Sequence, residues 1–400
     1  MKIFLEKSAL IPGLPLFFVC GMMEMYDTAW KNRGGIMERN DIIIIHGTDY
    51  KEMAKKVLER ADVAGDIGDR KKKVALKPNL VTARDPSAGG TTHKELLDGT
   101  LEYLKEHGFE DVVIMEGSWV GDSTQAAFSA AGYRDVAKKY GVELVDLQKD
   151  SYKEYEAKGM KIAVCDRAAE VDYMINMPVL KGHCQTIVTC ALKNNKGIIP
   201  NKEKRRFHTM GLHKPIAHLN TIAPNNFILV DNICGDLDFE EGGNPVVMNR
   251  VLGFKDPVLC DSYVCDCMGY SVDDIPYIRM AEKLGVGSTD TEHANFIYLN
   301  EDTVGKSKFR MTRRVENLAR YTDAEDACSA CYGSLIYALD RLNDAGMLRG
   351  RKDAVCIGQA FKGKTGEIGV GQCTCGFKKS LKGCPPKAID IVKFLEKEWK

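Results

Sequence analysis

The cysteine-rich stretch from Cys328 to Cys384 limits most strongly what this chain can fold into. Six of the chain's 14 cysteines lie in this stretch. It holds a Cys-x-x-Cys pair that begins at Cys328, a Cys-x-Cys pair that begins at Cys373, and a lone cysteine followed by two prolines. A Cys-x-x-Cys pair places two thiolates on one metal centre, and cysteines from a glycine-rich loop can complete the coordination. The spacing therefore indicates a metal centre held by sulfur alone.

We expect a [4Fe–4S] cluster at this centre. The expected ligands are Cys328, Cys331, Cys373 and Cys384, with Cys375 as the alternative to Cys373. A zinc site with four cysteine ligands is the second interpretation, and buried thiols or disulfides are the third. The spacing favours iron, because the second half of the stretch lacks the second Cys-x-x-Cys pair that is typical of a zinc ribbon.

The composition excludes several classes of function. Lysine plus arginine and aspartate plus glutamate each number 56, so the formal net charge is zero. This balance gives no reason to expect nucleic acid or a membrane as a partner. A chain of 400 residues with 14 cysteines is not a small secreted disulfide scaffold. Cysteines clustered at metal-ligand spacings indicate instead that the protein is cytoplasmic, in a reducing compartment such as that of an anaerobe.

The sequence divides into three expected segments. Residues 1–36 are interpreted as an N-terminal extension from a start assigned too early, residues 37–300 as an α/β core domain, and residues 301–400 as a cysteine-rich cluster-binding lobe. The apolar run at residues 9–23 is too short for a membrane helix and is interrupted by two prolines. A signal peptide is the alternative, although export would conflict with a cytoplasmic cluster.

Short apolar runs alternate with amphipathic helices along the core. Continuous apolar runs are typical of strands that are buried on both faces of a parallel sheet. The expected strands are residues 41–46, 74–76, 111–115, 142–145, 171–177, 227–231 and 296–299. Helices expected at residues 49–61 and 92–106 lie between the first of them. We therefore predict an α/β fold with a doubly wound, mostly parallel sheet and a C-terminal cysteine-rich iron–sulfur lobe.

Basic and amide side chains follow the ends of several of these strands. Ligands of open α/β sheets bind beyond the carboxyl ends of the strands, where lysines can supply charge and asparagines neutral donors. We therefore expect a small anionic ligand there. The expected ligand-binding residues are Lys77, Asn79, Lys193 and Asn194, and the expected catalytic residues are Lys181 and His183. The alternative is that these lysines are solvated strand-end charges and that His183 caps a helix.

The geometry of this site can be stated in advance. We expect the ammonium groups of Lys77 and Lys181 to line one concave pocket, because the strand ends bring them to one edge of the sheet. His183 could move a proton near neutral pH. A redox role requires proximity, so we also expect the cysteine lobe to form one wall of the pocket.

Two further motifs carry weaker signals. Gly358–Thr365 matches the phosphate-loop pattern G-x-x-x-x-G-K-T, but the glycine-rich residues that follow disfavour the helix that such a loop needs. We therefore expect no nucleotide there. His208, His213 and His218 repeat every fifth residue in a segment that reads as a polar loop. We expect substrate contact or surface histidines there rather than a three-histidine metal site.

Six blocks, in this order, resemble one known family. They are Lys77-Pro-Asn79-Leu80, Glu116-Gly-Ser118, Pro178-Val-Leu-Lys181-Gly-His183, Leu192-Lys193-Asn194, Ile216-Ala-His-Leu-Asn220 and Val230-Asp231. Together they resemble the domain-of-unknown-function 362 family over roughly residues 40–285. The resemblance implies association with iron–sulfur clusters but assigns no reaction. The cysteine region is similar to that of one branch; the two-cluster ferredoxin spacing of other branches is absent from this sequence.

These observations together predict an iron–sulfur protein that binds a small anionic ligand at strand ends. The favoured function is a redox enzyme or an electron-transfer component, with a redox partner protein as a second expected partner. One alternative is a cluster-dependent lyase or isomerase. The other is a non-enzymatic ligand-binding protein with a structural cluster or zinc.

Overall fold

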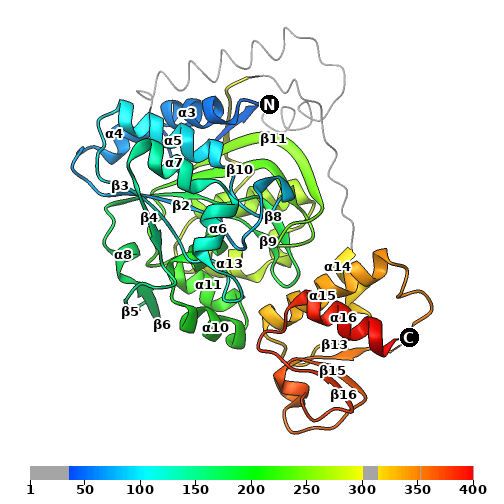
Figure 1. Cartoon of the computed structure of the whole chain (residues 1–400). Coiled ribbons are helices and arrows are strands. Elements are labelled where there is room, and N and C mark those ends of the chain that lie inside the picture. The colour runs from blue at the N-terminus through cyan, green and yellow to red at the C-terminus, as the bar shows by residue number, and fades with distance from the viewer. Residues whose placement is uncertain (1–35, 301–313, 352, 400) are drawn as a thin grey trace, which may run out of the picture.

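The computed structural model describes residues 36–300, 314–351 and 353–399 (Figure 1). The core is built around an eight-stranded sheet with the strand order β12-β1-β11-β10-β7-β2-β3-β4. Its strands are β1 (Asp41–His46), β2 (Val74–Pro78), β3 (Val112–Glu116), β4 (Glu143–Asp146), β7 (Tyr173–Met177), β10 (Phe227–Asp236), β11 (Pro245–Phe254) and β12 (Asn295–Tyr298). The expected N-terminal extension, residues 1–36, lies outside the described residues apart from its last position.

The sheet is mostly parallel. Five neighbouring strand pairs run parallel, whereas β11 runs antiparallel to both β1 and β10. The predicted α/β fold class with a mostly parallel sheet is therefore confirmed. The sequence does not predict β11, because the first half of this strand is partly exposed and polar, as at Asn249 and Arg250, and forms no continuous apolar run.

Helices cover both faces of the sheet (Figure 1). Successive residues of β1 alternate between the faces, so that Ile43 and Ile45 join one apolar cluster while Ile42 and Ile44 join the other. The first face packs on α3 (Tyr50–Arg60), α4 (Val63–Ile67), α5 (Lys94–Glu106), α6 (Thr124–Ala130) and α7 (Tyr133–Tyr140). The second face packs on α8 (Asp166–Ala169), α9 (Ala191–Asn194), α10 (Asn201–Met210), α11 (His213–Leu219), α12 (Pro257–Met268) and α13 (Pro276–Lys283).

Two small hairpins complete the core. β5 (Tyr152–Glu156) pairs antiparallel with β6 (Lys161–Cys165), and β8 (Lys181–His183) pairs antiparallel with β9 (Ile187–Thr189). The second hairpin follows β7 directly and carries two of the expected site residues. Short 3-10 turns lie at residues 86–88, 195–198 and 272–274.

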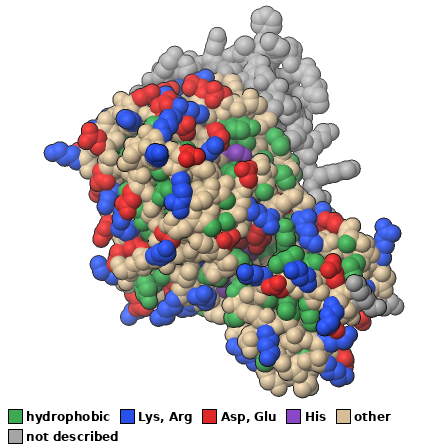
Figure 2. Space-filling model, viewed as in Figure 1, with side chains coloured by type: hydrophobic (Ala, Val, Ile, Leu, Met, Phe, Trp, Pro, Cys, Tyr) green, Lys and Arg blue, Asp and Glu red, His purple; other side chains and the backbone are tan. Residues whose placement is uncertain are grey.

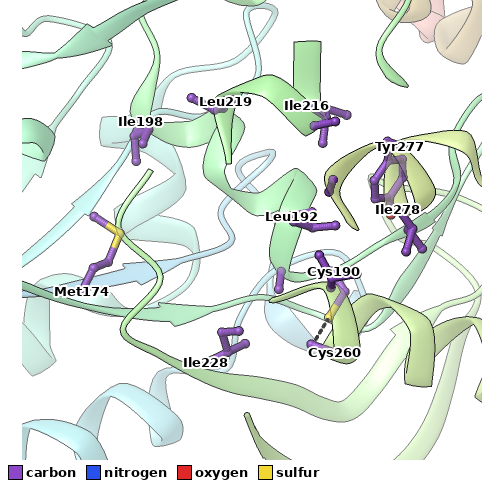
Figure 3. Packing of buried hydrophobic residues seen from close by; sticks show 14 of the residues in the cluster. Met174, Cys190, Leu192, Ile198, Ile216, Leu219, Ile228, Cys260, Tyr277 and Ile278 are labelled. Atoms are coloured by element: carbon purple, nitrogen blue, oxygen red, sulfur yellow. Dashed lines mark hydrogen bonds between the residues drawn. The ribbon is translucent and has the colours of Figure 1, made fainter. Parts of the chain in front are cut away.

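Helix α12 shows how local sequence sets an element boundary. The buried carboxylate of Asp256 accepts hydrogen bonds from the backbone N–H groups of Val258 (2.8 Å) and Leu259 (3.1 Å), which have no partner inside the helix. Proline occupies the first helical position, and Gly269 ends the helix in a left-handed conformation with φ of 76°. The apolar face of α12 packs into the cluster shown in Figure 3.

The segment that reads as a polar loop forms helices α10 and α11 instead. Glu203 and Phe207 are both buried and four residues apart, as are Lys204 and His208, so one face of α10 points inward. Gly211 ends α10 with φ of 79°. The strong charge of this segment hides its helical periodicity, because two of the four buried positions are charged.

The C-terminal residues form a second sheet with an apolar core of its own. We call residues 314–399 the C-terminal lobe. The four strands of this sheet, all parallel, are β13 (Thr322–Asp323), β14 (Val355–Cys356), β15 (Ile368–Val370) and β16 (Lys379–Leu381). Helices α14 (Arg314–Ala319), α15 (Ser329–Asp344) and α16 (Ala388–Glu398) pack against them around Leu335 and Leu395. The exact domain boundary at residue 301 stays a prediction.

The Gly358–Thr365 motif lies in this lobe. A short 3-10 turn at Gln359–Phe361 is followed by an irregular stretch and then by β15, so Thr365 does not lead into an α-helix. The motif therefore lacks the helix N-terminus that would face the phosphates of a nucleotide.

Acidic and basic side chains are interspersed over the face of the molecule seen in Figure 2. This pattern agrees with the formal net charge of zero. Within the described ranges, no helix combines the length and the apolar character needed to cross a lipid bilayer.

The carboxylate of Asp231 joins the middle of β10 to the start of α5. It is fully buried and accepts hydrogen bonds from the backbone N–H (2.7 Å) and the Nδ1 atom (2.9 Å) of His93. Burial by itself lowers the pKa of His93, but the charge of Asp231 outweighs burial and raises that pKa to about 11. The pair therefore stabilises the folded state fully below the ordinary histidine pKa of 6.5, and this contribution is lost as pH rises toward the folded value.

The Asp231→Asn variant tests this pair. We expect it to lower the free energy of unfolding by about 2–4 kcal/mol near pH 6, because the buried imidazolium loses its counter-charge. The difference from wild type should shrink at about pH 9, where the wild-type pair contributes less. Urea denaturation at both pH values measures it, with the exposed pair of Asp290 and His293 as control through Asp290→Asn. An equal difference at both pH values would contradict the ion pair.

Candidate functional site

The ends of β2 and β3 meet helix α9 in a buried polar network. The Nζ atom of Lys77 donates to Glu116 Oε2 (2.7 Å) and lies 3.3 Å from Asn194 Oδ1. Asn79 Nδ2 also donates to Asn194 Oδ1 (2.8 Å). Lys181 Nζ, from β8, donates to Asn79 Oδ1 (2.8 Å). Asn79 and Asn194 thus connect the two lysines. Lys181 and Asn79 are 102 residues apart in the sequence, and Lys77 and Asn194 are 117 residues apart.

Glu240 completes this network from the loop between β10 and β11. Its carboxylate lies 3.1 Å from His183 Nε2 and pairs with the ammonium group of Lys193. Its backbone carbonyl accepts a hydrogen bond from Lys181 Nζ (2.8 Å). The structure therefore brings all six expected site residues into one connected network.

A cavity of about 50 Å³ lies beside this network. The residues lining it are Asn79, Val81, Glu116, Gly117, Ser118, Trp119, Lys193, Asn194, Lys196, Gly197, Lys204, His208 and Glu240. Lys77 and Lys181 are fully buried and lie behind this lining, so the expectation that their ammonium groups line the pocket is wrong. Both ammonium groups donate to internal acceptors instead, which holds Asn79 and Asn194 in place.

Several lining residues were missed by sequence reasoning. Lys204 comes from α10, and the signal that could have found it is the four-residue spacing of the inward positions of this helix. His208, expected as a substrate contact or a surface histidine, lies on the same inward face of α10. Lys204 Nζ donates to the carbonyls of Gly117 (2.7 Å) and Ser118 (3.0 Å), which places its charge at the cavity. Glu240 reads in the sequence as part of a glycine-rich turn, and nothing local marks it as an ion-pair partner.

The backbone between α9 and α10 passes very close to the charged groups. A Cβ atom on Gly197 would lie 2.0 Å from Glu116 Oε1 and 2.5 Å from Lys77 Nζ. Only glycine leaves room for this approach. The close approach also brings Lys196 to the cavity.

The site lysines Lys181, Lys196 and Lys204 have lowered pKa values. Burial, followed by the charges of other lysines, lowers the pKa of Lys196 to about 7. Burial lowers the pKa of Lys204 and of Lys181 to about 8 each, although nearby glutamates oppose the shift. Burial and the charges of neighbouring lysines also lower the pKa of His208 well below its usual value. At neutral pH the site therefore contains lysines that are close to losing a proton and a neutral histidine.

His183 is held in one tautomer. Its Nδ1 atom accepts hydrogen bonds from the backbone N–H groups of Gln185 and Thr186, both at 3.0 Å. The proton therefore lies on Nε2, which donates to Glu240. Burial and the charge of Lys193 lower the pKa of His183 to about 4, so the ring is neutral at pH 7.

The four expected cluster ligands lie near one another in the lobe. Cys328 precedes α15, Cys331 lies in the first turn of α15, Cys373 lies in a 3-10 turn (Gln372–Thr374) and Cys384 lies on the loop before α16. Burial, followed by the charges of Cys328, Cys384 and Cys373, raises the pKa of Cys331 to about 12. Cys375 and Cys384 are both exposed, and of these two only Cys384 is among the charges that act on Cys331. The choice of Cys373 over Cys375 as the third ligand stays a prediction.

A separate group of potential ligands lies in the core. Cys190 Sγ and Cys260 Sγ are 3.7 Å apart and face one another among apolar side chains (Figure 3). With Asp261 they form the one group of three potential metal ligands within 4.8 Å of one another among the described residues. All three are fully buried, and burial raises the pKa of Asp261 to about 7. Tyr277 OH donates to Asp261 (3.1 Å), so the carboxyl group is already hydrogen-bonded.

The lobe packs against the loops that carry the network. A Cβ atom on Gly333 of α15 would lie 3.2 Å from the Sγ atom of Cys184, the residue after His183. Phe239, the residue before Glu240, belongs to the apolar cluster of the lobe and contacts Tyr337 edge to face, with ring centroids 5.7 Å apart. The C-terminal lobe therefore adjoins the side of the network formed by His183 and Glu240. None of the described residues that line the cavity belongs to the lobe, so the expectation that the lobe forms one wall of the pocket is wrong.

Part of this chain is similar to known proteins. The thylakoid-associated protein sll1697 of Synechocystis sp. (strain ATCC 27184 / PCC 6803 / Kazusa) is 25% identical over 233 residues, which are 56% of this chain and 71% of that protein. The structure of the lactate racemase apoprotein from Thermoanaerobacterium thermosaccharolyticum has a TM-score of 0.36 and 15% identity. That match covers 55% of this chain and 56% of the other. Residues 74–266 match the sequence model of the family described as domain of unknown function 362 (DUF362), in agreement with the resemblance that the six sequence blocks indicate.

Proposed function

We propose that this protein is an iron–sulfur redox protein in which the cluster site of the lobe adjoins a pocket for a small anion. The observation that carries this proposal is the packing of the cysteine-bearing helix α15 against Cys184, next to His183. Electron transfer to a bound ligand needs this kind of proximity. The redox role, the ligand and the cytoplasmic location are all part of the proposal.

The chemistry of the four cysteines fits an iron–sulfur cluster better than zinc. Zinc–sulfur bonds of about 2.3 Å hold four tetrahedral sulfur ligands about 3.8 Å apart. Within the described ranges, no three sulfurs of the lobe lie within 4.8 Å of one another. A cluster with four separate iron corners accepts more widely spaced thiolates. The residues that would hold it are Cys328, Cys331, Cys373 and Cys384, and the group supplies one-electron transfer when bound.

One hydrogen-bond donor lies beside one of these sulfurs. Gln359 Nε2 lies 3.5 Å from Cys328 Sγ. Donors to ligand sulfurs raise the reduction potential of an iron–sulfur centre by stabilising its more negative state. Gln359 belongs to the motif that resembles a phosphate loop, which gives this glycine-rich segment a role that needs no nucleotide.

The core residues bind and orient the anion in this proposal. Lys193 supplies ammonium donors, Asn79 and Asn194 supply neutral polar groups, and His183 holds Glu240 in position. Lys181 and Lys77 act behind them by fixing the amides. Asparagine amides that are already oriented cost little further entropy when a ligand binds.

A lyase or isomerase with the same cluster is the alternative enzyme class. It would need an iron with an open coordination position, and hence only three cysteine ligands. Our proposal assigns four cysteine ligands, which would leave no such position, and we therefore favour electron transfer. Zinc or a purely structural cluster would favour a non-enzymatic ligand-binding protein.

The metal content tests the first half of the proposal. Protein purified without oxygen should be brown and contain about four iron and four sulfide ions per chain. Cys328→Ser and Cys384→Ser should lose most of the visible absorption, whereas Cys190→Ser, which changes a core thiol, should keep it. One zinc ion per chain without sulfide would contradict the cluster.

The Lys193→Met variant tests the second half. We expect its affinity for inorganic phosphate to fall by about 10- to 100-fold, because the variant loses a cation and also leaves the charge of Glu240 uncompensated beside the cavity. Titration of the fluorescence of Trp119, which lines the cavity, can follow binding. The exposed Lys214, changed to Met, is the matched control. Equal phosphate affinity in the Lys193→Met and Lys214→Met variants would contradict the proposed anion site.

A further inference from the structure

Two ammonium groups at the cavity have no carboxylate partner. Lys77 and Lys193 are neutralised by Glu116 and Glu240. Lys204 donates only to backbone carbonyls, and Lys196 Nζ contacts only His208 Nε2, at 3.5 Å. Among the described residues, neither Lys196 nor Lys204 forms an ion pair. Since buried charge is normally paired, the cavity carries two positive charges in excess.

Two neutral polar atoms at the same cavity also lack partners. His208 Nδ1 and Ser118 Oγ are buried and make no hydrogen bond to any described residue. Both residues line the cavity. Buried polar atoms are rarely left without a partner in folded proteins. They are therefore available to donate hydrogen bonds to the oxygen atoms of a ligand, the imidazole through its Nδ1–H and the serine through its hydroxyl group.

The cavity limits the size of the ligand. Its volume of about 50 Å³ compares with roughly 10–15 Å³ on the same scale for one water molecule. It therefore has room for a few non-hydrogen atoms. A compact group fits this space, whereas a nucleotide or a long-chain acid would have to leave most of its atoms outside.

We propose that this cavity is selective for a compact dianion, either a phosphate group or a small acid with two carboxylates, bound between Lys196 and Lys204. The inference rests on the anion site of the proposed function and names the charge class of its ligand. Lys196 and Lys204 supply the two compensating charges. Ser118 and His208 complete the hydrogen bonds to the ligand oxygens.

The titration of these lysines sets the pH dependence. The pKa values of Lys196 and Lys204, lowered mainly by burial to about 7 and about 8, mean that both are protonated in mildly acidic solution. They lose their charge as pH rises through these values. Glu116 and Glu240, the carboxylates on the facing elements, oppose anion binding more strongly once the lysines are neutral. Dianion affinity should therefore fall as pH rises.

Sulfate and nitrate are the probes that isolate charge, because neither changes protonation between about pH 6 and pH 9. We expect sulfate to bind the full-length protein at least about tenfold more tightly than nitrate near pH 6, and its affinity to fall about tenfold or more by pH 9. Isothermal titration calorimetry measures both. Inorganic phosphate and malonate, titrated in parallel, distinguish the phosphate and dicarboxylate sources of the same chemistry.

Variants identify the residues. Lys196→Met and Lys204→Met should each lower sulfate affinity about tenfold or more and bring it close to that of nitrate, while Lys214→Met keeps the wild-type preference. Lys196 is partly exposed, so its variant should fold even where the buried Lys204 variant does not.

The outcomes separate the inference from the proposed function. Sulfate preference that depends on Lys196 supports the dianion site. Equal binding of sulfate and nitrate, or sulfate affinity that is independent of pH, would overturn the dianion inference and leave an anion site of lower charge. Binding of none of the four anions would overturn the inference together with the anion site of the proposed function.

Discussion

The carboxylate of Glu240 is the group on which the geometry of the site depends. It neutralises Lys193 and accepts a hydrogen bond from Nε2 of His183. Its neighbour in the sequence, Phe239, packs into the core of the C-terminal lobe. Without the charge of Glu240, the buried lysines around it and His183 would lie close together with no carboxylate at that position to balance them. The electrostatic cost would be large. The same loop therefore holds the network together and docks the lobe beside it.

The buried lysines explain why the network is so extensively hydrogen-bonded. Lys77 and Lys181 are fully buried, and each ammonium group donates to two or more acceptors. A buried ammonium group is stable only when its N–H groups have hydrogen-bond acceptors. The asparagines supply such acceptors and also line the cavity. Lys196 and Lys204 are the exception, because their compensation by carboxylates is incomplete. That exception, rather than the number of lysines, points to the charge of the ligand.

The sequence predicts those strands that are buried along their whole length, because they appear as continuous apolar runs. Strands such as β1 and β10 are buried along their whole length, and their apolar runs predict a parallel sheet. β11 and the β5–β6 hairpin could not be predicted in this way, because exposed residues interrupt their patterns. α10 was hidden for the opposite reason, since charged residues occupy its inward face. The rule that ligands bind at the carboxyl ends of parallel strands correctly predicted that the six site residues lie together. It could not predict that Lys77 and Lys181 lie behind the cavity or that Glu240 lines it, because these positions depend on side-chain packing between distant segments.

The central claim is that an iron–sulfur centre in the lobe lies beside the lysine-rich pocket of the core. Anomalous diffraction at the iron absorption edge, from crystals of protein prepared without oxygen, tests this claim most directly. The account predicts an iron peak enclosed by Cys328, Cys331, Cys373 and Cys384, next to the wall formed by His183 and Glu240. A zinc peak at these cysteines, or iron located elsewhere in the molecule, would contradict it.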